Sequence, residues 1–266
     1  MTPSEYCQEK AAKSGSSFYY AFLFLPPDRR LAITALYAFC REVDDVVDEC
    51  TDASIARIKL AWWRTQVEAM YQDKAEHPVT QALTPWLKPF HITRERLLAI
   101  IDGMEMDLDQ TRYLDWPALE KYCWHVAGVV GELSAGIFGK QSPEILKYAS
   151  KLGIAFQLTN IIRDVGDDAR RGRIYIPISD LQKFEVRAAD ILNSQYSSST
   201  RLYRLANTPC LIGHLVLVKS GYQPCRMSAH PCQSTPATKK ARCQNQKRCL
   251  TLFRNRQCKQ WSLFHL

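Results

Sequence analysis

Two short stretches of this chain place carboxylates within apolar helical sequence, and this placement constrains the fold more than any other feature. The first stretch is LYAFCREVDDVVDE, in which Tyr37, Arg41, Asp44 and Asp48 recur every three or four positions. That spacing aligns the four side chains along one face of an α-helix. Carboxylates among apolar neighbours lose their water and repel one another, so they need solvent, protein cations or bound metal as partners. The fold must supply such partners.

The second stretch is Phe156–Pro177, with the sequence FQLTNIIRDVGDDARRGRIYIP. If residues 153–169 form one helix, a single polar face carries Gln157, Asn160, Asp164 and Asp168. Three arginines surround Gly172 immediately afterwards, namely Arg170, Arg171 and Arg173. Acidic residues followed by a cationic turn are suited to a metal–diphosphate, because carboxylates bind the metal and guanidinium groups bind phosphoryl oxygens.

Together the two stretches predict that two helices far apart in sequence face each other across a metal site. Mg²⁺ takes only one or two protein carboxylates and completes its shell with water and phosphate oxygens, so several ions need several acidic side chains. A single DDxxD motif is weak evidence, since an acidic helix end is usually a solvated surface. Two such faces, the second followed by arginines, favour the metal site. A third acidic group, on Arg94–Asp109, is interpreted as a solvated helix end; it comprises Asp102, Glu105, Asp107 and Asp109.

Composition favours an all-α protein. The chain has 266 residues, of which 46% are apolar and 11 are glycine, and good helix formers dominate the sequence as far as Asp190. We therefore expect one helical domain over residues 1–192. The N-terminus lacks the order of a signal peptide. The apolar stretch Val126–Phe138 is interrupted by Glu132 and is too short to span a membrane. We expect a cytoplasmic protein and leave peripheral membrane association open.

Residues 193–266 differ in composition from the rest of the chain. From Ile191 onward there are 12 Lys and Arg, six of the ten cysteines and no acidic residue, whereas Met1–Asp190 holds 23 basic and 27 acidic residues. One interpretation is a basic tail that binds nucleic acid or an acidic membrane surface. The other is sequence that is not native coding sequence, such as the product of a shifted reading frame. We favour the second, because scattered Cys, Trp and Phe without helical periodicity are unusual in basic tails. We therefore expect no nucleic-acid partner.

The motifs resemble those of the squalene/phytoene synthase family over about residues 14–192. The resemblance is carried by SSFYYAFLFLPPDRRLAITALYAFCREVDDVVDE, IDGMEMDL, YCWHVAGVVGEL and LGIAFQLTNIIRDVGDDARRGRIYIP. Within that family the wording of the motifs is most similar to bacterial presqualene diphosphate synthases of hopanoid pathways. The resemblance implies the isoprenoid synthase fold, which is a helical bundle around a central apolar cavity. The C-terminal helices that close the bundle in relatives are missing or aberrant after Leu192, and we expect residues 193–266 not to continue it.

The implied reaction is the condensation of two farnesyl diphosphates to presqualene diphosphate, with release of diphosphate. It would require Mg²⁺, with Mn²⁺ as a substitute, and no nicotinamide cofactor. Phytoene synthesis from geranylgeranyl diphosphate is the alternative within the family. An inactive truncated bundle, or a binding protein with a basic tail, is the alternative from another class. The sequence leaves the oligomeric state open.

The resemblance also implies roles for individual residues. Metal binding falls to Asp44, Asp45, Asp48, Asn160, Asp164, Asp167 and Asp168. The diphosphate and polar parts of the substrate fall to Arg41, Gln157, Arg163 and Arg173. The prenyl pocket falls to Phe18, Ala127, Val130, Gly131 and Gly153. The implied catalytic residues are Asp44, Asp48, Asp164, Asp168 and Tyr37. The base that removes the proton is either Tyr37 or the released diphosphate.

Overall fold

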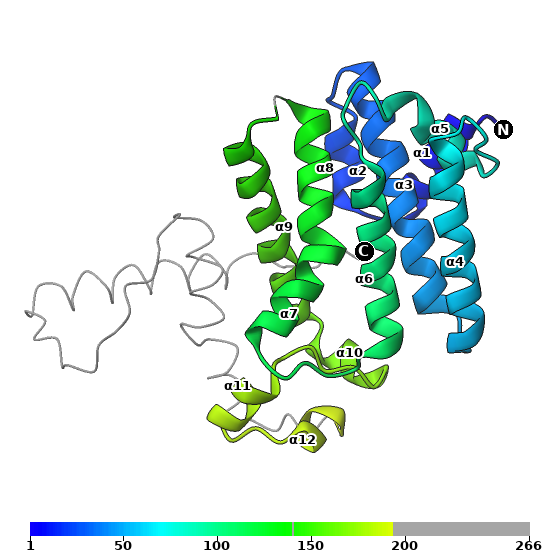
Figure 1. The fold of residues 1–266 in the computed structure, drawn as a ribbon. Coiled ribbons are helices and arrows are strands. Elements are labelled where there is room, and N and C mark those ends of the chain that lie inside the picture. Colours follow the sequence, from blue (N-terminus) through cyan, green and yellow to red (C-terminus); the bar gives the residue numbers. More distant parts are fainter. Residues whose placement is uncertain (140, 194–266) are drawn as a thin grey trace, which may run out of the picture.

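The computed structural model describes residues 1–139 and 141–193, which form a bundle of helices (Figure 1). Within these ranges there is no β-strand, and one isolated parallel bridge joins Arg112 to Ile174. The all-α prediction is therefore confirmed for the described residues. The predictions for the basic tail concern residues 193–266, and all of these except Asn193 lie outside the described ranges.

The helices follow one another in the order α1 to α12, with two short turns of other helical types. Their bounds are α1 Pro3–Lys13, α2 Ser17–Phe22, α3 Pro27–Glu49, α4 Ala53–Met70, α5 Pro78–Leu83, the 3₁₀ turn η1 Thr84–Trp86, α6 Arg94–Asp109, α7 Trp116–Cys123, the π-turn η2 Trp124–Gly128, α8 Val129–Phe138, α9 Pro143–Arg163, α10 Val165–Arg170, α11 Ile178–Lys183 and α12 Ala188–Leu192. Several begin at a polar side chain that accepts a backbone N–H, as expected for helix N-caps. Such caps are Thr2, Ser16, Asp52, Asp115 and Ser142.

Helix α3 lies in the middle of the bundle, and it packs against α1, α4, α5, α6 and α8. The long helices α3, α4, α6, α8 and α9 run side by side (Figure 1). Their apolar faces form the main core, which includes Phe39, Leu36 and Leu97. A second, smaller core lies under α10 to α12 at the lower end of the bundle in Figure 1. It consists of Ala169, Ile174, Ile176, Leu181, Val186 and Ile191.

Glycines allow α9 to approach α8 and the π-turn closely. A Cβ on Gly153 would lie 2.3 Å from the carbonyl oxygen of Ala127, and a Cβ on Gly131 would lie 2.3 Å from that of Ala149. Both distances are far below van der Waals contact, so only glycine fits at these crossings. Close helix packing is thus present at these two glycines.

The single helix considered for residues 153–169 is interrupted at Asp164, where the backbone departs from helical geometry. This residue has φ −101° and ψ 12°, and it separates α9 from α10. Hydrogen bonds still connect the two helices, since Asp164 N–H donates to Asn160 O and Asp168 N–H donates to Asp164 O. Aspartate and the nearby Gly166 are weak helix formers, which explains the interruption.

No helix in the described part of the chain is both long enough and apolar enough to cross a bilayer.

Candidate active site

On the acidic face of α3, the adjacent residues Asp44 and Asp45 are contacted by different numbers of cationic side chains. Arg41 donates from Nη1 to Asp44 Oδ2 at 2.9 Å and from Nη2 to Asp45 Oδ1 at 2.7 Å. Asp45 also forms an ion pair with Lys10 on α1, at 2.8 Å. Burial, and next the negative charge of Asp48, raises the pKa of Asp44 to about 7. Asp45 therefore has two cationic partners, whereas the buried Asp44 is undercompensated.

The second acidic face begins on α9 with two buried amides, Gln157 and Asn160. The Oε1 atom of Gln157 is buried and has no hydrogen-bond partner among the described residues. Asp164 is paired with Arg163 through Nε at 2.6 Å and Nη2 at 2.5 Å. Burial, and next the charge of Asp164, raises the pKa of Asp168 to about 7. The face thus presents a buried acceptor without a partner and a carboxyl that resists ionisation.

Asp167 lies apart from this group. Its side chain is 63% exposed and is paired with Arg170. It lies on α10, beyond the interruption at Asp164. A metal-binding role for Asp167 stays a prediction that this position does not favour.

The turn after α10 connects the second acidic stretch to the first. Gly172 has φ +77°, a conformation that glycine adopts without strain. The arginines on either side of it reach Asp48 on α3: Arg171 Nη1 lies 2.9 Å from Oδ2, and Arg173 Nη1 lies 3.4 Å from Oδ1. The structure therefore brings both stretches to one place, as the sequence predicted, with arginines between carboxylates.

Sequence reasoning missed Asp107 of α6, which it assigned to a solvated cluster. Tyr122 and Tyr175 each donate their hydroxyl to Asp107 at 2.9 Å. The ring of Tyr175 stacks on those of Tyr113 and Tyr122, which are tilted relative to each other, with centroids 5.2 to 5.9 Å apart. Burial raises the pKa of Asp107 to about 6, although Arg173 and the two hydroxyls act in the opposite direction. Asp107 thus belongs to the neighbourhood of the arginine turn.

Helical spacing could have distinguished Asp107 from its acidic neighbours. Asp102, Glu105 and Asp109 step by three and four positions and share one face of α6. The structure pairs that face with α4, where Arg64 contacts Asp102 and Glu105, and Arg57 contacts Asp109. Asp107 falls outside this stripe and points to another side of the helix. The deviation from periodicity was the available signal.

An apolar cavity lies between α2, α3, α8 and α9. Its lining includes Phe18, Phe22, Leu36, Tyr37, Cys40, Val130, Gly131, Gly153 and Phe156. Four of the five residues expected to line a prenyl pocket are in this set. Ala127 is not in it, and its role in a prenyl pocket stays a prediction. Its carbonyl oxygen faces Gly153 at the crossing of the π-turn with α9, so Ala127 serves close packing.

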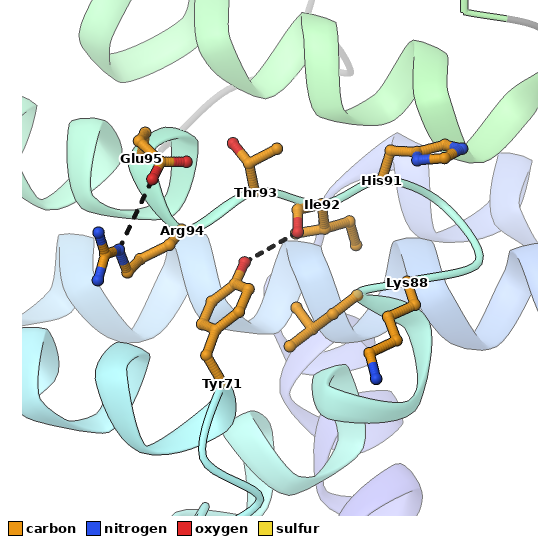
Figure 2. A pocket seen from close by; sticks show the side chains of 8 residues that line it. Tyr71, Lys88, His91, Ile92, Thr93, Arg94 and Glu95 are labelled. Carbon is orange, nitrogen blue, oxygen red and sulfur yellow. Dashed lines mark hydrogen bonds and ion pairs between the residues drawn. The ribbon is translucent and has the colours of Figure 1, made fainter.

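A second depression lies on the surface between the end of α4 and the start of α6 (Figure 2). Tyr71 donates its hydroxyl to the carbonyl of Ile92 at 2.8 Å there. Arg94 is paired with Glu68 at 3.1 Å and Glu95 at 3.7 Å. None of the predicted site residues lines this depression. It carries no functional assignment.

The chemistry of the acidic site suits a hard divalent cation. Within the described ranges no three His, Cys, Asp or Glu side chains are already arranged as a metal cluster. The available donors are nevertheless oxygens, and they include the undercompensated Asp44 and Asp168 and the Oε1 atom of Gln157. Asp48, which would also face such an ion, is paired with Arg171 and Arg173 in this structure.

Comparison with known proteins places this site in a family. Residues 11–210 match the family model described as squalene/phytoene synthase. The chain is 36% identical to a phytoene synthase of Arthrospira platensis over 210 residues, which cover 74% of this chain and 68% of that protein. It is 35% identical to phytoene synthase 3 of Zea mays, covering 73% and 47%, and 35% identical to 15-cis-phytoene synthase of Synechocystis, covering 71% and 60%. The chain therefore spans less than two thirds of the latter two relatives.

Solved structures agree with the family match. A dehydrosqualene synthase with bound ligand superimposes with a TM-score of 0.73 at 30% identity, covering 81% of this chain and 74% of that one. Squalene synthase HpnC from Alicyclobacillus acidocaldarius superimposes with a TM-score of 0.70 at 27% identity, covering 84% and 85%. The predicted isoprenoid synthase fold is thereby confirmed. The match to the family model and the similarity to these relatives show that this chain belongs to the squalene/phytoene synthase family.

Proposed function

We propose that this protein joins two farnesyl diphosphates head to head into presqualene diphosphate and releases diphosphate. The observation that carries the proposal is that α3 places a residue of the apolar cavity next to charged residues. Tyr37 lines the apolar cavity, and Arg41 and Asp44 follow on the next turns of the same helix. A prenyl diphosphate needs these two environments side by side, an apolar cavity for its chain and a charged site for its head group.

The residues proposed to hold Mg²⁺, or Mn²⁺ in its place, are Asp44, Asp48, Asn160, Asp164 and Asp168. When bound, the metal would neutralise charge on the diphosphate and make it a better leaving group. Arg171 and Arg173 already lie against Asp48. They can transfer their hydrogen bonds to phosphoryl oxygens, which guanidinium groups bind in the same geometry as carboxylates. The arginines would thus stabilise charge that develops as the leaving group departs.

The proposed bond changes balance without a redox partner. The C1–O bond of one farnesyl diphosphate breaks, and its electron pair leaves with the diphosphate. The double bond of the second molecule then attacks C1, and loss of a proton closes the cyclopropane ring. The apolar cavity excludes water, which would otherwise capture the allylic cation. Tyr37 and the released diphosphate are the candidates for the base.

Phytoene synthesis from geranylgeranyl diphosphate is the second candidate. It is favoured by the names of the curated relatives, which include phytoene synthases at 34–36% identity. The structural matches to a dehydrosqualene synthase and a squalene synthase favour the shorter substrate. The head-group chemistry is the same in both cases, so the depth of the cavity decides. The third candidate, a binding protein that uses the basic tail, concerns residues outside the described ranges.

Incubation of the full-length chain with each diphosphate and Mg²⁺ tests the proposal. We expect presqualene diphosphate from farnesyl diphosphate, identified by mass spectrometry, and less conversion of geranylgeranyl diphosphate. Addition of NADPH should not change the product. Formation of phytoene would establish the second candidate. Formation of squalene with NADPH would contradict a reaction that stops at presqualene diphosphate, and absence of product from both substrates would contradict the enzymatic proposal.

A further inference from the structure

The chain that follows the arginine turn is an extended segment that lies between the two cores. Ile174 and Ile176 pack into the small core, whereas Tyr175 belongs to the main core. This alternation is the one expected of extended backbone, in which successive side chains point to opposite sides. Among the described residues beyond Ile161, Tyr175 is the one buried member of the main core. It is therefore the side chain that attaches this segment to the bundle.

Backbone hydrogen bonds fix the segment to the residues that follow α6. Ile174 N–H donates to Thr111 O at 3.0 Å, and Ile178 N–H donates to Tyr113 O at 2.9 Å. The same part of the molecule supplies Asp107, which accepts the Tyr175 hydroxyl at 2.9 Å. A hydrogen bond to a carboxylate is stronger than one between neutral groups. The hydroxyl of Tyr175 thus adds a charge-assisted contact to a segment held otherwise by neutral backbone contacts and apolar packing.

The position of Tyr175 determines how far the arginine turn can move. Arg173 lies two residues before Tyr175, which limits their Cα separation to about 7 Å. Arg173 and Arg171 both reach Asp48 on α3, a helix that is distant in sequence. If Tyr175 moved away from Asp107, the turn would be released from its attachment next to these arginines. Loss of the hydroxyl alone would weaken that attachment without changing any charge.

We propose that Tyr175, held by Asp107, is a positioning residue that keeps Arg171 and Arg173 in place to bind the diphosphate of the substrate. This inference rests on the proposed function, because that function supplies the identity of the anion. Neither Tyr175 nor Asp107 needs to touch the reacting atoms. Their effect reaches the substrate through the two arginines.

Tyr122 provides a matched control for Tyr175. It donates to the same carboxylate at the same distance of 2.9 Å, and its ring is also buried. It comes from α7, however, and not from the segment that carries the arginines. The variants Tyr175→Phe and Tyr122→Phe therefore remove the same group from the same acceptor. The Tyr122 hydroxyl also lies 3.4 Å from that of Tyr175, but only Tyr175→Phe removes the direct bond between the arginine segment and Asp107.

Titration calorimetry of the full-length chain with inorganic diphosphate in the presence of Mg²⁺ tests the proposal. We expect Tyr175→Phe to raise the Kd for diphosphate about tenfold, which corresponds to about 1.4 kcal/mol. We expect Tyr122→Phe to change it less than about twofold, with a similar loss of thermal stability in both variants. In an Asp107→Asn background, Tyr175→Phe should cause little further change, because residues that act through one contact are not additive.

Three results would overturn the proposal. The first is an equal loss of diphosphate affinity in both tyrosine variants, which would indicate general destabilisation. The second is a full effect of Tyr175→Phe in the Asp107→Asn background. The third is unchanged affinity in Tyr175→Phe.

If the unaltered chain does not bind diphosphate, the proposed function fails. A measurement without ligand then tests whether Tyr175 attaches the arginine turn to the bundle. Trypsin should cut after Arg171 or Arg173 faster in Tyr175→Phe than in Tyr122→Phe. Equal rates of cleavage would refute the proposed attachment by Tyr175.

Discussion

Replacement of Asp44 by asparagine is expected to stabilise the ligand-free protein while it removes activity. Asp44 is 7% exposed, and burial with the nearby charge of Asp48 raises its pKa from 3.8 to about 7. A carboxyl whose pKa is higher in the folded state binds protons more tightly there than in the unfolded state. The folded protein therefore loses stability as the pH rises from the unfolded pKa to the folded one. Asparagine has the same shape and carries no charge at any of these pH values.

The size of the effect follows from the two pKa values. Above pH 7 the ionised Asp44 costs the folded state about 4 kcal/mol, at 1.36 kcal/mol for each pH unit between 3.8 and about 7. At about pH 5 the cost is about 2 kcal/mol, because nearly all of the folded protein still has a protonated Asp44 and only the unfolded state is ionised. The advantage of Asp44→Asn in free energy of unfolding should therefore grow by about 2–3 kcal/mol between about pH 5 and pH 8. This difference does not depend on the cost of burying the amide.

Urea unfolding at a series of pH values, without Mg²⁺ or diphosphate, measures this difference. Asp45→Asn is the matched control on the neighbouring residue. Asp45 is paired with both Arg41 and Lys10, so its replacement should lower stability by about 1 kcal/mol or less. The two variants are expected to shift stability in opposite directions at about pH 8. Mg²⁺ with diphosphate should then stabilise the unaltered protein more than Asp44→Asn.

A stability difference that does not change with pH would refute this reasoning. It would mean that Asp44 is not a buried, undercompensated carboxylate in the ligand-free protein. Retention of full activity by Asp44→Asn would separately refute its proposed role with the metal and the diphosphate.

Three further predictions address the site and the helix packing. Asp164→Asn should lower turnover at least about 100-fold while changing stability little, and a steady-state rate within about twofold of the unaltered enzyme would exclude a role in metal binding. Gly153→Ala should lower the free energy of unfolding by about 1–3 kcal/mol, because its Cβ would overlap the carbonyl oxygen of Ala127. Urea unfolding measures the change, and Gly139→Ala is the control, because a Cβ added there would meet no other group within 4 Å. Removal of divalent ions with EDTA should abolish product formation, and Mg²⁺ or Mn²⁺ should restore it, whereas activity that persists in EDTA would contradict the metal requirement.

Local sequence determined the helices and the faces that they present. The stretch LYAFCREVDDVVDE, predicted to be helical, lies within α3, and the acidic group on Arg94–Asp109 lies on α6, as expected of a helix. These features depend on residues within one or two turns, which is the range over which helical propensity and periodicity act. The alignment of Tyr37, Arg41 and Asp44 follows for the same reason. The family motifs added the expectation of a shared site, because they come from proteins that already have the fold.

Tertiary structure alone decided which of these side chains meet and which are buried. Helical spacing sets Asp107 apart from the neighbouring acids, but only the fold brings Tyr122 and Tyr175 to it from other parts of the chain. Asp48 meets Arg171 across 123 positions of sequence, a contact that no local pattern specifies. The pKa of Asp44 depends on its burial, which the packing around α3 creates. Spacing along the chain can predict a face, but desolvation and charge pairing depend on what packs against that face, and this is set by contacts between distant segments.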